Sequence, residues 1–350
     1  MIKKLVRKNI ETLKPYSCAR MEYSGDGLFM DANENPFQSV KIGLKIDLNR
    51  YPDPYATDLR KSLSNYLRVS AKNIFVSSGS DEIIDLLMRI FLNENDEIVI
   101  FEPTYGMYRA SAETANAKVK VCLLNADFQI DFRALPQCIS KKTKMIFICR
   151  PNNPTGNLIS EDDVISVCKM FDGIVVVDEA YIEFSSAKSV SRLSPLIQNL
   201  VVLRTFSKAW GLAGIRVGYA ITNAEIISYL NKVKLPYNVS AVSQYIATLA
   251  LNRPNQMIRL RDKIVSEREK LKNILEKMGF KVFPSEANFL LIKSKYSDKI
   301  FEKLIEKYRI IVRRFKNKPL VEDCFRITIG TPRQNDLLLK SIKKIVYGTN

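Results

Sequence analysis

Short apolar runs recur along the middle of this chain, and segments of helical length separate them. The runs cover residues 73–76, 97–101, 118–124, 144–149, 173–178, 199–204 and 217–222. Most of them are continuously apolar, which indicates strands buried on both faces, as in a parallel sheet between helices. The alternation therefore predicts an α/β fold with a mostly parallel, seven-stranded sheet.

A second pattern begins at Arg253-Pro254, where this alternation breaks. A long helix is expected from about residue 256 to 278, because Gly279 suits the position after a helix end. Four strands and two helices then complete a smaller α+β domain, at 281–283, 287–293, 310–313 and 324–329 and at 298–308 and 333–346. We therefore predict a large domain at 46–252, a small domain at 253–350, and an N-terminal arm at 1–45 that forms part of the small domain.

The composition describes a soluble globular protein, because 46% of the 350 residues are hydrophobic and 26% are charged. No apolar run approaches the ~18 residues of a membrane span, and the N-terminus lacks the apolar core of a signal peptide. We therefore expect a cytoplasmic protein with no membrane partner. The six cysteines form no C-x-x-C pair, so reduced, buried thiols are expected rather than disulfides or a metal site.

The sequence contains no histidine, which excludes Ser-His-Asp and Cys-His catalysis, H-E-x-x-H zinc sites and histidine-ligated haem. Acid–base work must therefore fall to lysine, tyrosine or carboxylates. The net charge of +17 suggests anionic partners, but the basic residues are interleaved with glutamates and carry no nucleic-acid motif. We expect small phosphorylated ligands and no nucleic acid.

The stretch from residue 203 to 218 contains a lysine, two arginines, two hydroxyl residues and three glycines, a combination that simple packing does not require. Lys208 lies among apolar and small neighbours, where lost hydration lowers the pKa of an amine and makes it a usable nucleophile for a Schiff base to an aldehyde cofactor. Thr205, Ser207 and Arg216 supply the donors that a phosphate binds. The alternative is a strand-turn-strand segment with surface charges.

Other predicted strands also end in polar residues, and ligands of open α/β sheets lie at those strand ends. Gly79, Ser80 and Asp81 open a helix whose free N–H groups could hold a phosphate, although Ser80 or Asp81 could equally be an N-cap. Tyr105 could stack on a planar cofactor or belong to the core. Asp178 ends a Val-Val-Val strand, where desolvation favours a cationic partner such as a protonated pyridine; an N-cap or a metal ligand is the alternative.

Prolines and a glycine rigidify the turn at residues 150–156, which aims the amide of Asn153. Together these segments resemble the fold-type I, pyridoxal-phosphate-dependent aminotransferases of the aspartate aminotransferase superfamily. Within it, the chain is most similar to the histidinol-phosphate aminotransferase family. The resemblance rests on LKPY at 13–16, DANENP at 31–36, RYPD at 50–53, PTYGMY at 103–108, PNNPTG at 151–156, DEAYIEF at 178–184, RTFSKA at 204–209 and FRITIG at 325–330.

The resemblance implies a role for individual residues. Lys208 would bond to the cofactor aldehyde and move the reacting proton, Asp178 would pair with the pyridinium nitrogen, and Tyr181 would act at the ring's 3-oxygen with Asn153. The implied cofactor-binding residues are Gly79, Ser80, Asp81, Tyr105, Asn153, Asp178, Tyr181, Thr205, Ser207, Lys208, Arg216 and, from the neighbouring subunit, Tyr51. The implied substrate-binding residues are Tyr16, Asn33, Arg313 and Arg326.

The resemblance further implies a cytoplasmic homodimer with pyridoxal 5′-phosphate as its cofactor. The implied reaction is transamination of L-histidinol phosphate with 2-oxoglutarate, which gives imidazole acetol phosphate and glutamate in histidine biosynthesis. Two alternatives share the fold, an aromatic amino acid aminotransferase and a phospho-amino-acid decarboxylase. A third alternative is a basic nucleic-acid or regulatory binding module that keeps the fold without catalysis.

Overall fold

The computed structural model describes residues 27–30, 33, 50–316 and 318–348. Its larger sheet has seven strands in the order β2-β8-β7-β6-β5-β3-β4. In that order the strands are Ile74–Ser77, Gly218–Ile221, Leu200–Thr205, Ile174–Asp178, Thr143–Cys149, Glu97–Glu102 and Lys118–Leu123. Only the two pairings made by β8 are antiparallel. The predicted mostly parallel α/β sheet is therefore confirmed.

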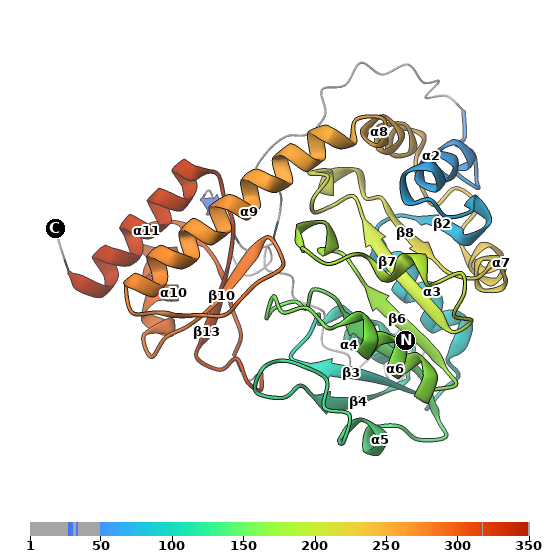
Figure 1. The fold of residues 1–350 in the computed structure, drawn as a ribbon, viewed down its shortest axis with the longest axis horizontal. Helices are drawn as coiled ribbons and strands as arrows, with labels where there is room; N and C mark the ends of the chain where they lie inside the picture. The colour runs from blue at the N-terminus through green and yellow to red at the C-terminus, as the bar shows by residue number, and fades with distance from the viewer. Residues whose placement is uncertain (1–26, 31–32, 34–49, 317, 349–350) are drawn as a thin grey trace, which may run out of the picture.

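Helices cover both faces of this sheet (Figure 1). One face packs against α3 (Ser80–Phe91), α4 (Met107–Thr114) and α7 (Ala224–Val233). The other face packs against α6 (Glu161–Met170), α2 (Thr57–Leu67) and α8 (Ala241–Leu251). The inner strands are buried along their length, whereas most side chains of β4 are exposed because β4 is an edge strand. Short helical segments complete this part, namely η3 (Ala71–Asn73), α5 (Leu135–Cys138), η4 (Ile182–Phe184), η5 (Val190–Arg192) and η6 (Ala213–Ile215).

The second sheet is antiparallel and has the order β12-β13-β10-β9. Its strands are Arg313–Arg314, Cys324–Thr328, Phe289–Lys293 and Lys281–Val282. The helices beside it are α9 (Pro254–Lys277), α10 (Ser297–Glu306) and α11 (Pro332–Tyr347). The long predicted helix is confirmed, and it begins two residues early because proline suits the first turn of a helix.

The N-terminal strand β1 (Leu28–Phe29) pairs with β11 (Ile310–Ile311) and so joins the C-terminal part of the chain. The two larger sheets lie on either side of the predicted boundary at residue 252, and α9 runs between them (Figure 1). The division into an arm and two domains stays a prediction. Within the described part of the chain, no helix combines the length and apolarity needed to cross a membrane.

Candidate active site

A cavity of about 450 Å³ opens at the carboxyl ends of β5, β6 and β7. Most of the residues predicted for the cofactor lie around it. Its lining consists of Ser80, Asp81, Tyr105, Cys149, Asn153, Asp178, Ala180, Tyr181, Thr205, Ser207, Lys208, Ala213 and Arg216. The sheet therefore brings together side chains from segments that are far apart in the sequence.

Asp178 is the last residue of β6 and is buried beneath the cavity. The Tyr108 hydroxyl donates a 2.9 Å hydrogen bond to its Oδ2, and the backbone N–H of Ala180 donates one of 3.1 Å to its Oδ1. Burial raises the pKa of Asp178 to about 6, and the negative charge of Asp81 adds to this shift. A positively charged N–H group in the cavity would oppose both effects, so the carboxylate suits a cationic partner.

The alternative assignments of Asp178 receive little support. It accepts a hydrogen bond from Ala180 but begins no α-helix, because η4 starts only at Ile182. Among the described residues, no group of three or more histidine, cysteine, aspartate or glutamate side chains could hold a metal ion. The remaining role that its burial explains is pairing with an organic cation.

Tyr181 also lines the cavity, and its hydroxyl accepts hydrogen bonds from two amide donors. Asn33 Nδ2 donates to its hydroxyl at 3.1 Å and Asn153 Nδ2 at 3.5 Å. Burial raises the pKa of Tyr181, so the neutral hydroxyl is retained over the physiological range and can itself donate. Lys208 Nζ lies 5.7 Å from the centre of the Tyr181 ring. The predicted nucleophile and the predicted partner of the ring oxygen therefore share one end of the site.

The predicted phosphate cup is closely packed around two glycines. Gly79 has φ +80°, and a Cβ there would lie 2.6 Å from Arg216 Nη2. A Cβ on Gly218 would lie 2.3 Å from the backbone nitrogen of Ser80. The residue that caps α3 is Gly79, and no side chain caps the helix, so the interpretation of Ser80 or Asp81 as an N-cap is wrong. The first N–H groups of α3 remain available to an anion.

Hydroxyl and guanidinium groups complete this cup. Thr205 Oγ1 donates to Ser207 Oγ at 3.0 Å, and Arg216 Nη1 donates to the same Ser207 oxygen at 3.5 Å. The Asp81 carboxylate accepts a 3.1 Å hydrogen bond from the Tyr105 hydroxyl and lies 3.7 Å from Arg216 Nη2. Asp81 therefore orients a ring at the cavity wall and a cation at the cup.

Two predicted substrate residues lie on the smaller sheet. Arg313 on β12 and Arg326 on β13 are direct cross-strand partners, and Arg326 Nη1 donates to Asn153 Oδ1 in the turn after β5. The Asn33 backbone carbonyl accepts a 2.9 Å hydrogen bond from Asn288, which fixes this residue between the two sheets. Tyr16 lies outside the described residues.

Tyr51 does not line the cavity of its own chain. Its ring stacks on Tyr237 with centroids 4.5 Å apart and stays 81% exposed. It borders a second cavity of about 600 Å³, which shares Arg216 with the first.

Tyr108 and Cys149 are not among the residues predicted for the site. Cys149 is the strand partner of Asp178, and burial raises the pKa of its thiol to about 12. Tyr108 lies in the first turn of α4, three residues after Tyr105, which precedes the helix in the same PTYGMY segment. That shared segment is the signal that could have identified Tyr108.

The residues present fit one known cofactor. A lysine, a buried carboxylate and a group of phosphate donors surround a single cavity, and the glycines at 79 and 218 let Arg216 and the start of α3 approach each other beside it. Fold and site therefore define an enzyme of the pyridoxal 5′-phosphate-dependent transferase class.

Comparison with known proteins gives the family. A model of the aminotransferase class I and II family matches residues 25–342, and the chain belongs to this family, whose members use pyridoxal 5′-phosphate. The chain is 43% identical over 344 residues to the histidinol-phosphate aminotransferase of Cytophaga hutchinsonii, covering 97% of each chain. It is 42% identical to that of Parabacteroides distasonis, covering 98% of this chain and 99% of the relative.

Solved structures agree on the fold. The histidinol-phosphate aminotransferase of Sinorhizobium meliloti, in complex with pyridoxal-5′-phosphate, superposes with a TM-score of 0.89 at 22% identity over 98% of both chains. That of Clostridium acetobutylicum superposes with a TM-score of 0.82 at 28% identity, over 92% of this chain and all of the other.

Proposed function

We propose that this protein transfers the amino group of L-histidinol phosphate to 2-oxoglutarate, which gives imidazole acetol phosphate and glutamate in histidine biosynthesis. The names of relatives at 42–43% identity support this reaction. The observation that carries it is the direct pairing of Arg313 with Arg326 beside Asn153. Two arginines opposite each other on adjacent strands concentrate positive charge at one place, which attracts an anionic substrate.

These two arginines suit both partners of the reaction. Histidinol phosphate is a phosphate monoester without an α-carboxylate, whereas 2-oxoglutarate is a dicarboxylate. A guanidinium binds either anion through two parallel hydrogen bonds. We assign Arg326 to both substrates and Arg313 mainly to the phosphate, with Tyr16 and Asn33 as further substrate-binding residues.

When bound, the cofactor supplies an aldehyde carbon that receives the amino group and a ring that accepts electrons from the substrate carbon. Lys208 Nζ would take the proton from that substrate carbon and deliver it to the cofactor carbon that receives the amino group. The Asp178 carboxylate holds the proton on the ring nitrogen, and Tyr108 fixes the orientation of this carboxylate. Tyr181 and Asn153 would hold the ring oxygen, and Tyr105 would provide an aromatic wall for the ring.

The phosphate of the cofactor is assigned to the cup described above. The backbone N–H groups at Ser80 and Asp81, the hydroxyls of Thr205 and Ser207, and Arg216 provide its donors. Gly79 leaves room for the Arg216 guanidinium at the start of α3, because a Cβ there would lie 2.6 Å from Arg216 Nη2. The Asp81 carboxylate acts through Tyr105 and Arg216.

The proposed active unit is a homodimer in the cytoplasm. Tyr51 is exposed and does not line the first cavity, yet it borders a second cavity that reaches Arg216. A second copy of the chain placed there would receive the Tyr51 hydroxyl at its cofactor phosphate. Tyr55, Leu235 and Tyr237 are also exposed, and they provide the apolar surface that a stable dimer buries.

A transamination assay with defined amino donors tests the function. Purified protein is mixed with histidinol phosphate, phenylalanine or tyrosine, and the conversion of the cofactor to its amine form is followed by absorbance. We expect the highest kcat/KM with histidinol phosphate and regeneration by 2-oxoglutarate. A preference for phenylalanine or tyrosine would instead assign the chain to the aromatic amino acid aminotransferases. Release of CO₂ from a phospho-amino acid, added as a fourth substrate, would assign it to the decarboxylases.

A further inference from the structure

Three charged residues lie side by side on the face of the large sheet that is turned away from Asp178. Cys149, Asp178 and Leu203 are in register on β5, β6 and β7, and the next residue of each strand is charged. Arg150 N–H donates to the Asp178 carbonyl at 2.8 Å and Glu179 N–H to the Leu203 carbonyl at 2.9 Å, so the register continues. Because side chains alternate across a sheet, Arg150, Glu179 and Arg204 point to the side opposite Asp178.

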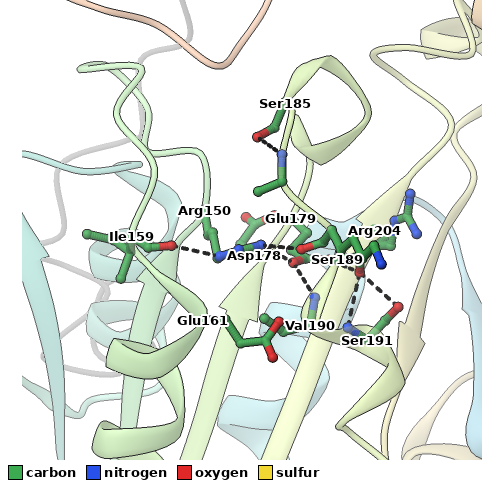
Figure 2. A network of polar contacts seen from close by, with 12 residues as sticks. Arg150, Ile159, Glu161, Asp178, Glu179, Ser185, Ser189, Val190, Ser191 and Arg204 are labelled. Carbon is green, nitrogen blue, oxygen red and sulfur yellow. Dashed lines mark hydrogen bonds and ion pairs between the residues drawn. The ribbon is translucent and has the colours of Figure 1, made fainter.

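Arg150 and Glu179 form a buried ion pair, drawn in Figure 2. Arg150 Nη1 lies 2.9 Å from Glu179 Oε1, and the two side chains are 2% and 0% exposed. The Val190 N–H also donates to Oε1 at 2.9 Å, and the Ser189 hydroxyl donates to Oε2. Arg150 Nε donates to the Ile159 carbonyl at 2.8 Å. The pair therefore has a single geometry, fixed by neighbours on both partners.

Arg204 forms the second pair, with Glu183. Its Nη2 lies 2.6 Å from Glu183 Oε1, and the two side chains are 7% and 4% exposed. Burial raises the pKa of Glu179, and the positive charges of Arg204 and Arg150 both oppose that shift, so Glu179 interacts with both arginines. Two arginines and two glutamates thus form one buried cluster of zero net charge, which we call the four-charge cluster.

The four-charge cluster is placed directly behind the catalytic residues. Glu179 follows Asp178 in the chain, and Tyr181 lies between the two glutamates. Arg150 begins the turn that carries Asn153, and Arg204 lies four residues before Lys208. Each ion pair therefore ties the segment 178–183 to one neighbouring strand end, the first to that of Asn153 and the second to that of Lys208.

Stability alone does not account for such a cluster. Removing four charges from water is costly, and well-packed apolar residues of similar volume often stabilise a protein as well or better. Directed hydrogen bonds, however, fix relative orientation in a way that apolar contacts do not. An error of about 1 Å between reacting groups can cost about a hundredfold in rate.

We propose that Arg150, Glu179, Arg204 and Glu183 are positioning residues that hold Asn153, Asp178, Tyr181 and Lys208 in their mutual geometry. The proposal rests on the proposed function, since it concerns the same site. None of the four lines the cavity, so they act only through the residues they orient.

The test replaces each pair as a unit, so that no buried charge is left alone. The variants are Arg150→Met/Glu179→Leu and Arg204→Met/Glu183→Leu. The matched control is Arg89→Met/Asp85→Leu, which removes an exposed ion pair on α3. Three quantities are measured: the thermal midpoint of the cofactor-free protein, the pH midpoint of the absorbance change of the bound cofactor, and kcat and KM.

We expect both buried-pair variants to fold with thermal midpoints near that of the parent protein. Their kcat should fall about ten- to a hundredfold with KM changed less than about threefold, because orientation is lost while binding groups remain. Their absorbance midpoint should move to higher pH, because Tyr181 and Asn153 no longer meet the ring oxygen correctly. A kcat and a pH midpoint equal to those of the control would overturn the proposal.

A substitute variant and a measurement without substrate distinguish failure of this proposal from failure to fold and from failure of the proposed function. If a double variant fails to fold, Arg150→Lys, which keeps the charge but not the forked geometry, is measured in its place. An unchanged pH midpoint and kcat in Arg150→Lys would then overturn the proposal. The absorbance titration needs no substrate, so failure of the parent protein to use histidinol phosphate contradicts the proposed function and leaves this test intact.

Discussion

The Tyr108 hydroxyl donates a 2.9 Å hydrogen bond to Oδ2 of Asp178, from a helix that covers one face of the sheet to the end of its central strand. Tyr108 is fully buried, and its ring stacks on Phe147 with centroids 4.8 Å apart. The aromatic packing thus fixes the hydroxyl, and the hydroxyl fixes the carboxylate.

Tyr108→Phe keeps the ring and removes this donor. A hydrogen bond to a charged group contributes about 1.5–3 kcal/mol, so kcat should fall about ten- to a hundredfold. Cofactor affinity should change much less, because the phosphate cup is untouched. Steady-state kinetics and a fluorescence titration with pyridoxal 5′-phosphate measure the two effects. The exposed Tyr296→Phe serves as the control, and equal kcat values in both variants would remove Tyr108 from the site.

Asp178 predicts an unusual pH dependence of the cofactor-free protein. Its pKa is raised from 3.8 to about 6 in the fold, so between these values the folded state binds more protons than the unfolded one. Its contribution to stability is therefore present below pH 4 and is lost as the pH rises through 6, by on the order of 2–3 kcal/mol.

Urea unfolding of the cofactor-free parent and of Asp178→Asn at pH 4 to 7 measures the contribution of Asp178 to the free energy of unfolding. The parent should lose stability relative to the variant as the pH rises, and saturating cofactor should abolish the difference in slope. No histidine titrates in this window, since the sequence has none. Parallel curves for the two proteins would show that the Asp178 carboxyl is not perturbed. Asp178→Asn should also lose turnover far more than it loses cofactor affinity.

Lys208 is expected to carry the cofactor covalently. Borohydride treatment of the yellow protein should leave the pyridoxyl group on the peptide that contains Lys208. Lys208→Ala should still bind the cofactor through the cup but lose at least about a thousandfold in kcat, because no histidine can replace the base. Label on another lysine would contradict the assignment. Lys270→Ala, at an exposed position of α9, is the control for both measurements.

Arg313→Ala tests the anion site on the smaller sheet. Loss of one charge-assisted contact should lower kcat/KM for histidinol phosphate about ten- to a hundredfold and affect phenylalanine much less. Arg314→Ala is a close control, because this neighbour on the same strand pairs instead with Asp298 at 2.7 Å and lies over Phe301. Small, equal losses on both amino donors would leave Arg313 as a strand-end charge without a substrate role. Arg326→Ala should impair both half-reactions.

Tyr51 is expected to act across a dimer interface. In a mixed dimer of Tyr51→Phe with Lys208→Ala, one site contains both the parental Lys208 and the parental Tyr51, so its cofactor affinity should equal that of the parent protein. In a mixed dimer of the parent with a chain that carries both changes, no such site exists and affinity should fall. Equal affinities in the two mixed dimers, or an active monomer in sedimentation, would refute the shared site.

Much of the fold could be predicted from continuous apolar runs such as 144–149 and 199–204. Runs of this length and apolarity form inner strands of a sheet that has helices on both faces, as these two do. The cavity residues followed, because parallel strands end at one edge and their polar last residues therefore meet. The reversed direction of β8 could not be predicted, since its apolar run is the same in either orientation.

The contacts that orient the site residues could not be predicted from the sequence. Arg150 and Glu179 are 29 positions apart, and Tyr108 and Asp178 are 70 apart. The sequence around these residues does not show which partner each charge or hydroxyl contacts. The register of neighbouring strands determines the first contact, and the packing of α4 determines the second. For a similar reason, the sequence left open the alternative that Ser80 or Asp81 caps α3, since the close approach of Gly218 to Ser80 is a tertiary constraint.

The hydrogen bond from Arg326 to Asn153 joins the two sheets at the place where a substrate anion is expected. An anion that takes this guanidinium must compete with the Asn153 oxygen, and the Asn153 amide also reaches the Tyr181 hydroxyl. Binding of an anion at Arg326 therefore changes the free energy of cofactor binding beside Asn153 and Tyr181. Linkage is reciprocal, so the factor by which the cofactor changes the affinity for an anion equals the factor by which that anion changes the affinity for the cofactor. The affinity for the substrate anion and the affinity for the cofactor then depend on one and the same coupling constant.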